Sequence, residues 1–515
     1  MRLAPIRFLP AALFSIFALA GCPGTSGIGV TDAGIDAGTD AGVDAGTIPT
    51  INSFTATPNS LPSGGGLVTL AWDVTGATTL SVDQGVGAVA PSTVGNKVVL
   101  VGASATFTLT ATNEAGSSTV DAPVTVAAPP PTQTVSGTVV DDDGQPAPGR
   151  TVLIAAVNFD QTVVTDANGA FSVADVPTPY DATIVEASQA IQYKGLTRPD
   201  PSLTAFFLVR NRSAVLTGHF DGGVFPETSN YKTDFIFASP EVTDSLADPP
   251  TGDYSSTISW SGPATTTGTL YALQIRNDGG LPSDYPGYGV LSGVVLEDMQ
   301  TLPGQNVSLS PVTAGTLSGT VFYPTNYSLF SKSLALQAAP FVTLFFVSDF
   351  SSDAIFSYTT PAISNTTLVV EAAATSDAGE FSATVKTAQS ANASGVELEI
   401  ASAPLLTQPA NMATGVTAGV TAFSWTIFAG GVYELSASSA SGPSVTVITA
   451  ATTAVLPDLS DAGFLLPTST VYTWSIVGLA PVQNVDLLAA PGGLNRATID
   501  ISEGVSASQN FTTAP

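Results

Sequence analysis

Residue types that carry out chemistry are scarce in this chain. It has one cysteine, Cys22, and one histidine, His219, against 41 acidic residues. A Ser-His-Asp triad would depend on His219, but no G-x-S-x-G turn is present to expose a nucleophilic serine. A zinc motif with two histidines is excluded by the count. His219 stands beside a turn in VLTGHFDGG, so we expect a surface or core histidine there and not a catalytic one.

The acidic residues could serve hydrolysis or calcium binding. Glycoside hydrolysis needs two carboxylates roughly 5–10 Å apart in a cleft, and the least assigned region, 212–312, is where such a pair would matter. The Asp-Ala-Gly units of 31–46 fit neither a nine-residue β-roll repeat nor an EF-hand. Asp141-Asp142-Asp143 lacks an EF-hand glutamate, because the twelfth position holds Val152. We therefore expect the Asp-Ala-Gly units to be a spacer and Asp141-Asp142-Asp143 to be a solvated turn. We expect no metal or other cofactor, and no enzymatic activity.

Cys22 follows a segment with the features of an export signal. Arg2 and Arg7 form a positive end, and FLPAALFSIFALA at 8–20 is apolar but shorter than the roughly 20 residues that span a bilayer. Its end, Leu19-Ala20-Gly21-Cys22, resembles the lipobox of bacterial lipoproteins. The resemblance implies that 1–21 is removed, that the Cys22 thiol carries diacylglycerol and that the new N-terminus is acylated, for example with palmitate. A membrane is then one partner.

The resemblance also indicates where the protein is held. Two or three acyl chains anchor a protein firmly, whereas one binds marginally. An Asp directly after the cysteine commonly retains lipoproteins in the inner membrane of double-membrane bacteria, and here that residue is Pro23. We therefore expect a lipid-anchored protein of the cell envelope, either periplasmic or surface-exposed. The outer membrane is favoured over the inner membrane. Residues 22–49 contain no basic residue and no apolar periodicity, which predicts a disordered acidic tether.

Length and composition predict the fold class. Val, Thr and Phe alternate with Gly, Pro, Asn and Asp turns, and charged residues are only 10% of the chain. A chain of 515 residues holds about four or five domains. We therefore expect an all-β protein of tandem β-sandwich domains. The net charge of −28 offers no cationic stripe for phosphates, so nucleic acid is not an expected partner.

Two kinds of sandwich are indicated in the first half. In 50–128, LVTLAWDV puts Leu70, Trp72 and Val74 on one face, and ATFTLTATNEAGSSTVDAPVTV reads as a hairpin. This resembles immunoglobulin-like domains of the PKD-like kind, which implies a core tryptophan. A Pro-rich linker, 129–132, comes next. In 133–211, TVSGTVVDDDGQPAPG and TDANGAFSV resemble the carboxypeptidase regulatory-like, or transthyretin-like, sandwich.

The second half contains a repeat of that pattern. TLSGTVFYP at 316–324 echoes TVSGTVVDD, and SDAGEFSATV at 376–385 echoes TDANGAFSV. These stretches predict a second regulatory-like domain over 315–402, with 212–314 left as a β domain of no assigned family. FVTLFFV at 341–347 is too short to span a membrane and predicts a strand buried on both faces.

The last region, 403–515, resembles a fibronectin type III or related immunoglobulin-like sandwich. Its signal is alternation: Phe423, Trp425 and Ile427 should share one buried face. Tyr472, Trp474 and Ile476 should share another.

The expected function follows from anchor and modules together. We expect a non-enzymatic lipoprotein that displays a string of β-sandwiches for adhesion, scaffolding or surface interaction, with an unknown protein or glycan ligand. The alternative is a carbohydrate- or peptidoglycan-binding lipoprotein. For that alternative, the tyrosines of DYPGYG at 284–289 could stack on sugars, although tyrosines packed in a loop are the simpler expectation.

Overall fold

The computed structural model describes residues 47–515, except 91, 130, 142, 206–209, 279, 340–341, 441 and 492–498. The lipobox cysteine Cys22, the export signal, most of the tether and Pro130 of the linker lie outside the described residues. The described chain is all-β, as the composition predicts, with a single α-helical turn, α1 (Val485–Leu488), and a 3-10 turn, η1 (Ser460–Ala462). None of the described helices is both long and apolar enough to cross a membrane.

The N-terminal sandwich consists of β1–β8. Its sheets have the orders β1-β3-β6 and β2-β8-β7-β4-β5, which is an immunoglobulin-like arrangement. Leu70, Trp72 and Val74 of β3 all point into the core, so the predicted alternation is confirmed. The strands are β1 (Thr50–Thr57), β2 (Ser60–Leu61), β3 (Gly66–Thr75), β4 (Thr79–Val82), β5 (Gly87–Val89), β6 (Val94–Val101), β7 (Ala105–Asn113) and β8 (Gly116–Val126).

Three sandwiches with one strand order follow, and we call them the first, middle and last repeat sandwich. The first has β9 (Thr132–Val140), β10 (Thr151–Ala156), β11 (Phe159–Val164), β12 (Ala170–Pro177), β13 (Tyr180–Val185), β14 (Gln189–Leu196) and β15 (Ser202–Thr204). The middle has β16 (Arg212–Asp221), β17 (Tyr231–Ala238), β18 (Thr243–Leu246), β19 (Asp253–Trp260), β20 (Thr265–Asp278), β21 (Leu281–Glu297), β22 (Thr301–Leu302) and β23 (Val307–Ser308). The last has β24 (Ala314–Phe322), β25 (Tyr327–Ala339), β26 (Val342–Asp349), β27 (Ile355–Pro361), β28 (Thr367–Ser376), β29 (Phe381–Gln389) and β30 (Val396–Glu399).

The strand pairing of the three is the same. In each, the opening strand pairs antiparallel with the fourth strand and parallel with the closing strand: β9 with β12 and β15, β16 with β19 and the short β22 and β23, β24 with β27 and β30. The other sheet runs β11-β10-β13-β14, and β18-β17-β20-β21 and β26-β25-β28-β29 repeat that order. The region that the sequence left without a family thus has the topology of its two neighbours.

A glycine of the opening strand marks all three. Its register partner on the fourth strand is aromatic. A Cβ on the glycine would overlap both that aromatic side chain and a backbone carbonyl from the segment carrying the closing strand. Only glycine leaves room for these neighbours. The pairs are Gly137 with Phe171, Gly218 with Tyr254, and Gly319 with Phe356.

One of the two predicted echoes is wrong. TLSGTVFYP falls in β24, the equivalent of β9, but SDAGEFSATV leads into β29, whereas TDANGAFSV leads into β12, which is equivalent to β27. The two stretches have similar sequences because each contains a turn with the same hydrogen-bond pattern. The Asp166 carboxylate accepts hydrogen bonds from the N–H groups two and four residues on, and the Ser376 hydroxyl does the same.

The C-terminal sandwich fills the space between the first and last repeats. Its strands are β31 (Leu406–Gln408), β32 (Ala413–Val416), β33 (Ala422–Trp425), β34 (Val432–Ser438), β35 (Ser444–Thr449), β36 (Thr453–Val455), β37 (Val471–Ala480), β38 (Ile501–Val505) and β39 (Gln509–Thr513). One of its sheets is β31-β33-β36. The other continues into both neighbours, because β35 pairs with β14 and β38 pairs with β29.

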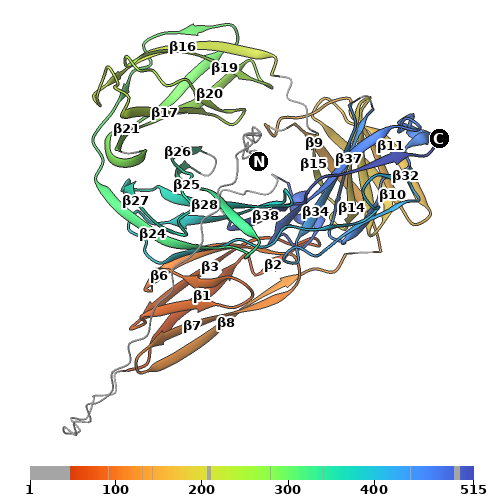
Figure 1. Cartoon of the computed structure of the whole chain (residues 1–515), viewed down its shortest axis with the longest axis horizontal. Helices are drawn as coiled ribbons and strands as arrows, with labels where there is room; N and C mark the ends of the chain where they lie inside the picture. The colour runs from red at the N-terminus through yellow and green to blue at the C-terminus, as the bar shows by residue number, and fades with distance from the viewer. Residues whose placement is uncertain are drawn as a thin grey trace, which may run out of the picture.

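The predicted tandem sandwiches are thus present, and three of them are joined through a common sheet. One sheet runs β11-β10-β13-β14-β35-β34-β37-β38-β29-β28-β25-β26 through three sandwiches. In Figure 1 its labels cross the molecule from the right, with the N-terminal sandwich below and the middle repeat at upper left. Backbone pairing between strand edges places sandwiches side by side although up to about 250 residues separate them in sequence, as Gln189 opposite Ser444 shows.

The sandwiches also share cores. One cluster of buried apolar side chains joins Leu100 of the N-terminal sandwich, Ile191 of the first repeat, Val385 of the last and Leu487 of α1. The predicted strand at 341–347 is β26, whose described side chains Val342, Leu344, Phe346 and Val347 are buried. β26 ends the long sheet and is covered there by β17 and β21 of the middle repeat, so an apolar edge strand is not exposed.

Candidate functional site

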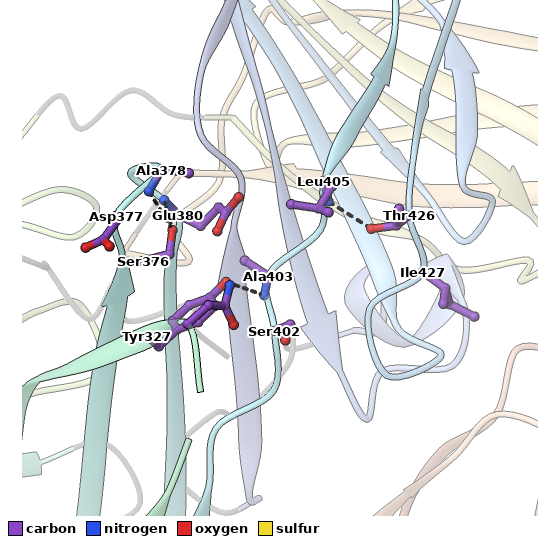
Figure 2. Close-up of a pocket in the computed structure, with 11 residues that line it drawn as sticks. Tyr327, Ser376, Asp377, Ala378, Glu380, Ser402, Ala403, Leu405, Thr426 and Ile427 are labelled. Carbon is purple, nitrogen blue, oxygen red and sulfur yellow. Dashed lines mark hydrogen bonds between the residues drawn. The ribbon is translucent and has the colours of Figure 1, made fainter. Parts of the chain in front are cut away.

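A pocket of about 460 Å³ opens at the junction of the last repeat and the C-terminal sandwich. We call it the junction pocket. Its walls come from four places: the start of β25, the turn between β28 and β29, the connecting segment 402–405, and the residues after β33. Figure 2 shows the turn on one side and the C-terminal sandwich on the other, with the connecting segment between them. The site therefore exists only where two sandwiches meet.

Local hydrogen bonds hold these walls in place. The Ala403 N–H donates to the Tyr327 hydroxyl at 2.9 Å, and the Leu405 N–H donates to the Thr426 hydroxyl at 2.8 Å (Figure 2). The Ser376 hydroxyl accepts from the N–H groups of Ala378 and Glu380, both at 3.2 Å. The connecting segment is thus tied to both sandwiches.

The wall from the last repeat carries the negative charge. Asp377 is exposed at the tip of the turn, and Glu380 is only 7% exposed. In Figure 2 the Glu380 side chain points toward the connecting segment, on the side of Tyr327. Burial and the neighbouring Glu380 carboxylate raise the pKa of Tyr327. Among the described residues, neither carboxylate takes part in an ion pair.

The opposite wall is apolar and open. Leu405 is 50% exposed and Ile427 is 71% exposed. The sequence placed Ile427 in the core with Phe423 and Trp425, and that prediction is wrong. β33 ends at Trp425, so the alternation stops one step before Ile427. Tyr472, Trp474 and Ile476 are buried as predicted. No motif pointed to the pocket, because its residues come from four separate segments between Asn326 and Ile427.

His219 lies in β16 and pairs with an acid on the neighbouring strand. Its Nδ1 lies 2.7 Å from an Asp253 carboxylate oxygen, and both side chains are open to solvent. Asp253 is its register partner on β19. This is a cross-strand pair on a sheet surface, so of the two positions expected, surface or core, the histidine takes the surface one.

The turn at Asp141–Asp143 is a junction and not the solvated turn predicted. Asp141 accepts from the N–H groups of Asp143 and Gln145 and from the Ser261 hydroxyl of the middle repeat. Asp143 accepts two hydrogen bonds from Arg210, at 2.9 and 3.1 Å. Burial raises the pKa of Asp141. Asp142 lies outside the described residues, and elsewhere in the described ranges no three His, Cys, Asp or Glu side chains gather as metal ligands.

The tyrosines of DYPGYG are packed, but in a strand. They belong to β21, and Tyr285 is 1% exposed. Its hydroxyl donates to the Thr359 carbonyl at 2.6 Å, and its ring meets Phe346 edge-on at 5.8 Å. Tyr285 therefore joins the middle and last repeats and is not available to stack on a sugar.

One pair of acids in 212–312, Glu227 and Asp248, lies too close together for the arrangement that hydrolysis requires. Glu227 interacts with Asp248 through a hydrogen bond, and burial raises the pKa of Glu227. Its carboxylate also accepts from Thr233 and Gln274, at 2.5 and 2.9 Å. Carboxyl groups in direct contact leave no space for a glycosidic bond and a water between them.

Comparison with known proteins identifies one of the sandwiches. Residues 134–205, which span β9 to the segment after β15, match the carboxypeptidase regulatory-like domain family. The molecule is thus a multidomain β-sandwich protein that contains such a domain, as the sequence resemblance predicted. No curated protein matches the chain.

Solved structures give a weaker likeness. The Bacillus anthracis TIE protein is 11% identical over 68% of this chain and 74% of its own, with a TM-score of 0.14. A bacterial ice-binding adhesin is 15% identical over 50% of this chain and 99% of its own, and a segment of titin is 12% identical over 45% and 93%, both with TM-scores of 0.14. Scores this low carry no argument about function.

Proposed function

We propose that this chain is a membrane-anchored lipoprotein of the bacterial cell envelope, without enzymatic activity, that presents five fused β-sandwiches for adhesion, scaffolding or surface interaction. The observation that carries the proposal is the sheet that continues through three sandwiches. Such a body is stiff, because moving one sandwich would break backbone hydrogen bonds and a shared core. A stiff body on a tether suits the presentation of a binding surface.

The distribution of charge supports an interaction role. Eight of the ten lysines and arginines in the described part pair with an acid: Lys97, Arg150, Lys194, Arg198, Arg210, Arg212, Arg276 and Lys332, the other two being Lys232 and Lys386. Two of them also link separate parts of the body: Lys97 pairs with Asp500 of the C-terminal sandwich at 2.9 Å, and Arg210 pairs with Asp143 and Asp244. The cations are used internally, and the excess of acids is left for the surface and for partners.

The anchor rests on the sequence of the N-terminal segment. Leu19-Ala20-Gly21-Cys22 resembles a lipobox, and Cys22 is the one thiol of the chain. The folded body begins close behind the tether, since Asn113 donates to the Thr47 carbonyl and Ser118 to the Pro49 carbonyl. A lipid at Cys22 would therefore hold the body within a tether length of the membrane.

Lipid labelling tests the anchor directly. Cells expressing the full chain are grown with a fatty-acid analogue, and we expect label on the wild type and none on Cys22→Ala. Cys22→Ser keeps the size of the side chain and should also lack label. Equal labelling of wild type and Cys22→Ala would overturn the lipoprotein assignment. Membrane fractionation of the same cells should find the wild type with the membranes and Cys22→Ala released from them.

A further inference from the structure

We infer that the junction pocket binds the side chain of a lysine or arginine, flanked by apolar residues, in a segment of a partner protein. The inference rests on the proposed role in surface interaction and names the chemistry of the partner. Three observations carry it: a buried carboxylate with no cation partner among the described residues, an apolar wall opposite, and the charge of the whole molecule.

The first observation is that the buried carboxylate of Glu380 favours a cationic ligand. Glu380 is 7% exposed, and its carboxylate interacts with the Tyr327 hydroxyl. No described lysine or arginine pairs with it. A charge removed from water without an opposite charge is costly, so a cation entering the pocket would gain from pairing with it. Asp377 at the rim of the same turn adds a second negative charge along the way in.

The apolar wall selects an organic cation over a metal ion. Leu405 and Ile427 stand exposed across the pocket from the two carboxylates (Figure 2). Lysine and arginine carry a charged head on an aliphatic stem, and apolar neighbours in the partner would cover these two side chains. Calcium would need about six to eight oxygen ligands. A sugar would need an exposed aromatic face, whereas Tyr327 is 6% exposed.

The charge of the molecule favours the same partner. Acids outnumber bases 41 to 13, and most described bases are already paired. A negative surface attracts basic segments and speeds their association at low salt. The pocket would then fix which basic residue enters.

The test measures binding of blocked peptides to the full chain by titration calorimetry. The probes are acetyl-Leu-Lys-Leu-amide, acetyl-Leu-Arg-Leu-amide and the neutral acetyl-Leu-Gln-Leu-amide. We expect the two basic peptides to bind at least about tenfold more tightly than the neutral one, the change expected when a charged hydrogen-bond partner is lost. The advantage should shrink as salt rises. Equal binding of all three, or no binding of any, would overturn the inference.

Variants locate the binding. Asp377→Asn and Glu380→Gln should each weaken the basic peptides about tenfold or more, and leave the neutral one unchanged. Asp377 is exposed, so its variant folds even if Glu380→Gln is destabilised. The control is Asp461→Asn, an exposed acid on η1 of the C-terminal sandwich. Binding that survives both pocket variants, or falls equally in the control, places the peptides elsewhere.

The outcome is separable from that of the proposed function. If peptides fail to bind while Cys22 is lipidated and the protein still attaches to its surface partner, only the pocket assignment is lost. If Cys22 carries no lipid while the pocket discriminates lysine from glutamine, the anchor is lost and the pocket stands. Tighter binding of neutral oligosaccharides than of basic peptides would reverse the assignment of ligand class.

Discussion

The first and last repeat sandwiches have the same strand order, yet they join the C-terminal sandwich in opposite senses. Their equivalent sixth strands, β14 and β29, are each the outermost strand of their own sandwich's part of the sheet. Both pair with the C-terminal sandwich, β14 parallel to β35 and β29 antiparallel to β38. An edge strand presents unpaired N–H and C=O groups that either direction of pairing satisfies. The free edge strand of each repeat therefore determines where the C-terminal sandwich attaches. Whether the pairing is parallel or antiparallel depends on which strand of the C-terminal sandwich lies at that edge.

The two seams differ in chemistry as well as direction. Beside the seam with the first repeat, Asp486 of α1 receives hydrogen bonds from Thr197 and Arg198. Near the seam with the last repeat, Glu371 of β28 lies close to another acid, Glu503 of β38. The first seam is reinforced by a buried acceptor, and the second carries repulsion. The middle repeat joins neither seam and packs on the last repeat through Tyr285.

The largest expected effect concerns the reinforced seam. Asp486 is 3% exposed and accepts from the Thr197 N–H at 2.8 Å and the Arg198 N–H at 3.0 Å. Asp486→Ala would leave these buried donors without an acceptor, at a cost of about 3 kcal/mol or more. We expect a lower urea midpoint and faster amide exchange at 197–198. Asp461→Ala, an exposed counterpart, should change neither, and protection retained in Asp486→Ala would refute the reinforcement.

The glycines test whether the three repeats share one packing solution. A Cβ at Gly137 would lie 2.5 Å from Phe171 Cζ, and one at Gly319 would lie 2.6 Å from Phe356 Cζ. Overpacking of this kind costs about 2 kcal/mol. We expect similar losses of unfolding free energy for Gly137→Ala, Gly218→Ala and Gly319→Ala.

Ser318→Ala is the matched control for the glycines, because it changes the residue next to Gly319 on a half-exposed face. It should alter the stability by less than about 0.5 kcal/mol. A loss confined to one of the three glycines would show that the shared register does not carry shared packing.

The repulsive seam should respond to pH. Burial, and secondarily Glu503, raises the pKa of Glu371 from 4.5 to about 7. The folded state thus holds this proton more tightly than the unfolded state. The carboxyl's contribution to stability is complete below about pH 4.5 and is lost as pH rises through about 7.

Glu371→Gln should remove that dependence and be more stable than the wild type above pH 7, on the order of 2 kcal/mol. The measurement is urea unfolding between pH 5 and 8. Glu114→Gln, at an exposed turn of the N-terminal sandwich, should follow the wild-type curve. Parallel curves for Glu371→Gln and wild type would remove the electrostatic contrast between the seams.

The smallest effect concerns the middle repeat. Tyr285→Phe keeps the ring against Phe346 and removes the hydrogen bond to the Thr359 carbonyl. We expect the free energy of unfolding to fall by about 1 kcal/mol. Amide exchange should increase near this junction and stay unchanged at the two seams of the long sheet. Exchange that increases across the whole molecule would indicate that the middle repeat supports those seams too.

Much of the fold could be predicted from local pattern. Trp72, Trp474 and the SGTV stretches lie where alternation and register put them, because strand periodicity and tight packing act over a few residues. The pattern failed where an element ended, as at Ile427, and where two different turns shared one chemistry, as at Asp166 and Ser376.

The sequence by itself determined the class of fold, the regulatory-like sandwich at 134–205 and the scarcity of chemical groups. Tertiary structure alone decided that β14 meets β35, that Asp143 meets Arg210 and that Glu380 faces Ile427 across a pocket. These contacts join segments far apart in the chain. Edge hydrogen bonds and buried charges carry no periodic signature, because any strand edge can pair and any acid can meet a distant base once burial brings them together.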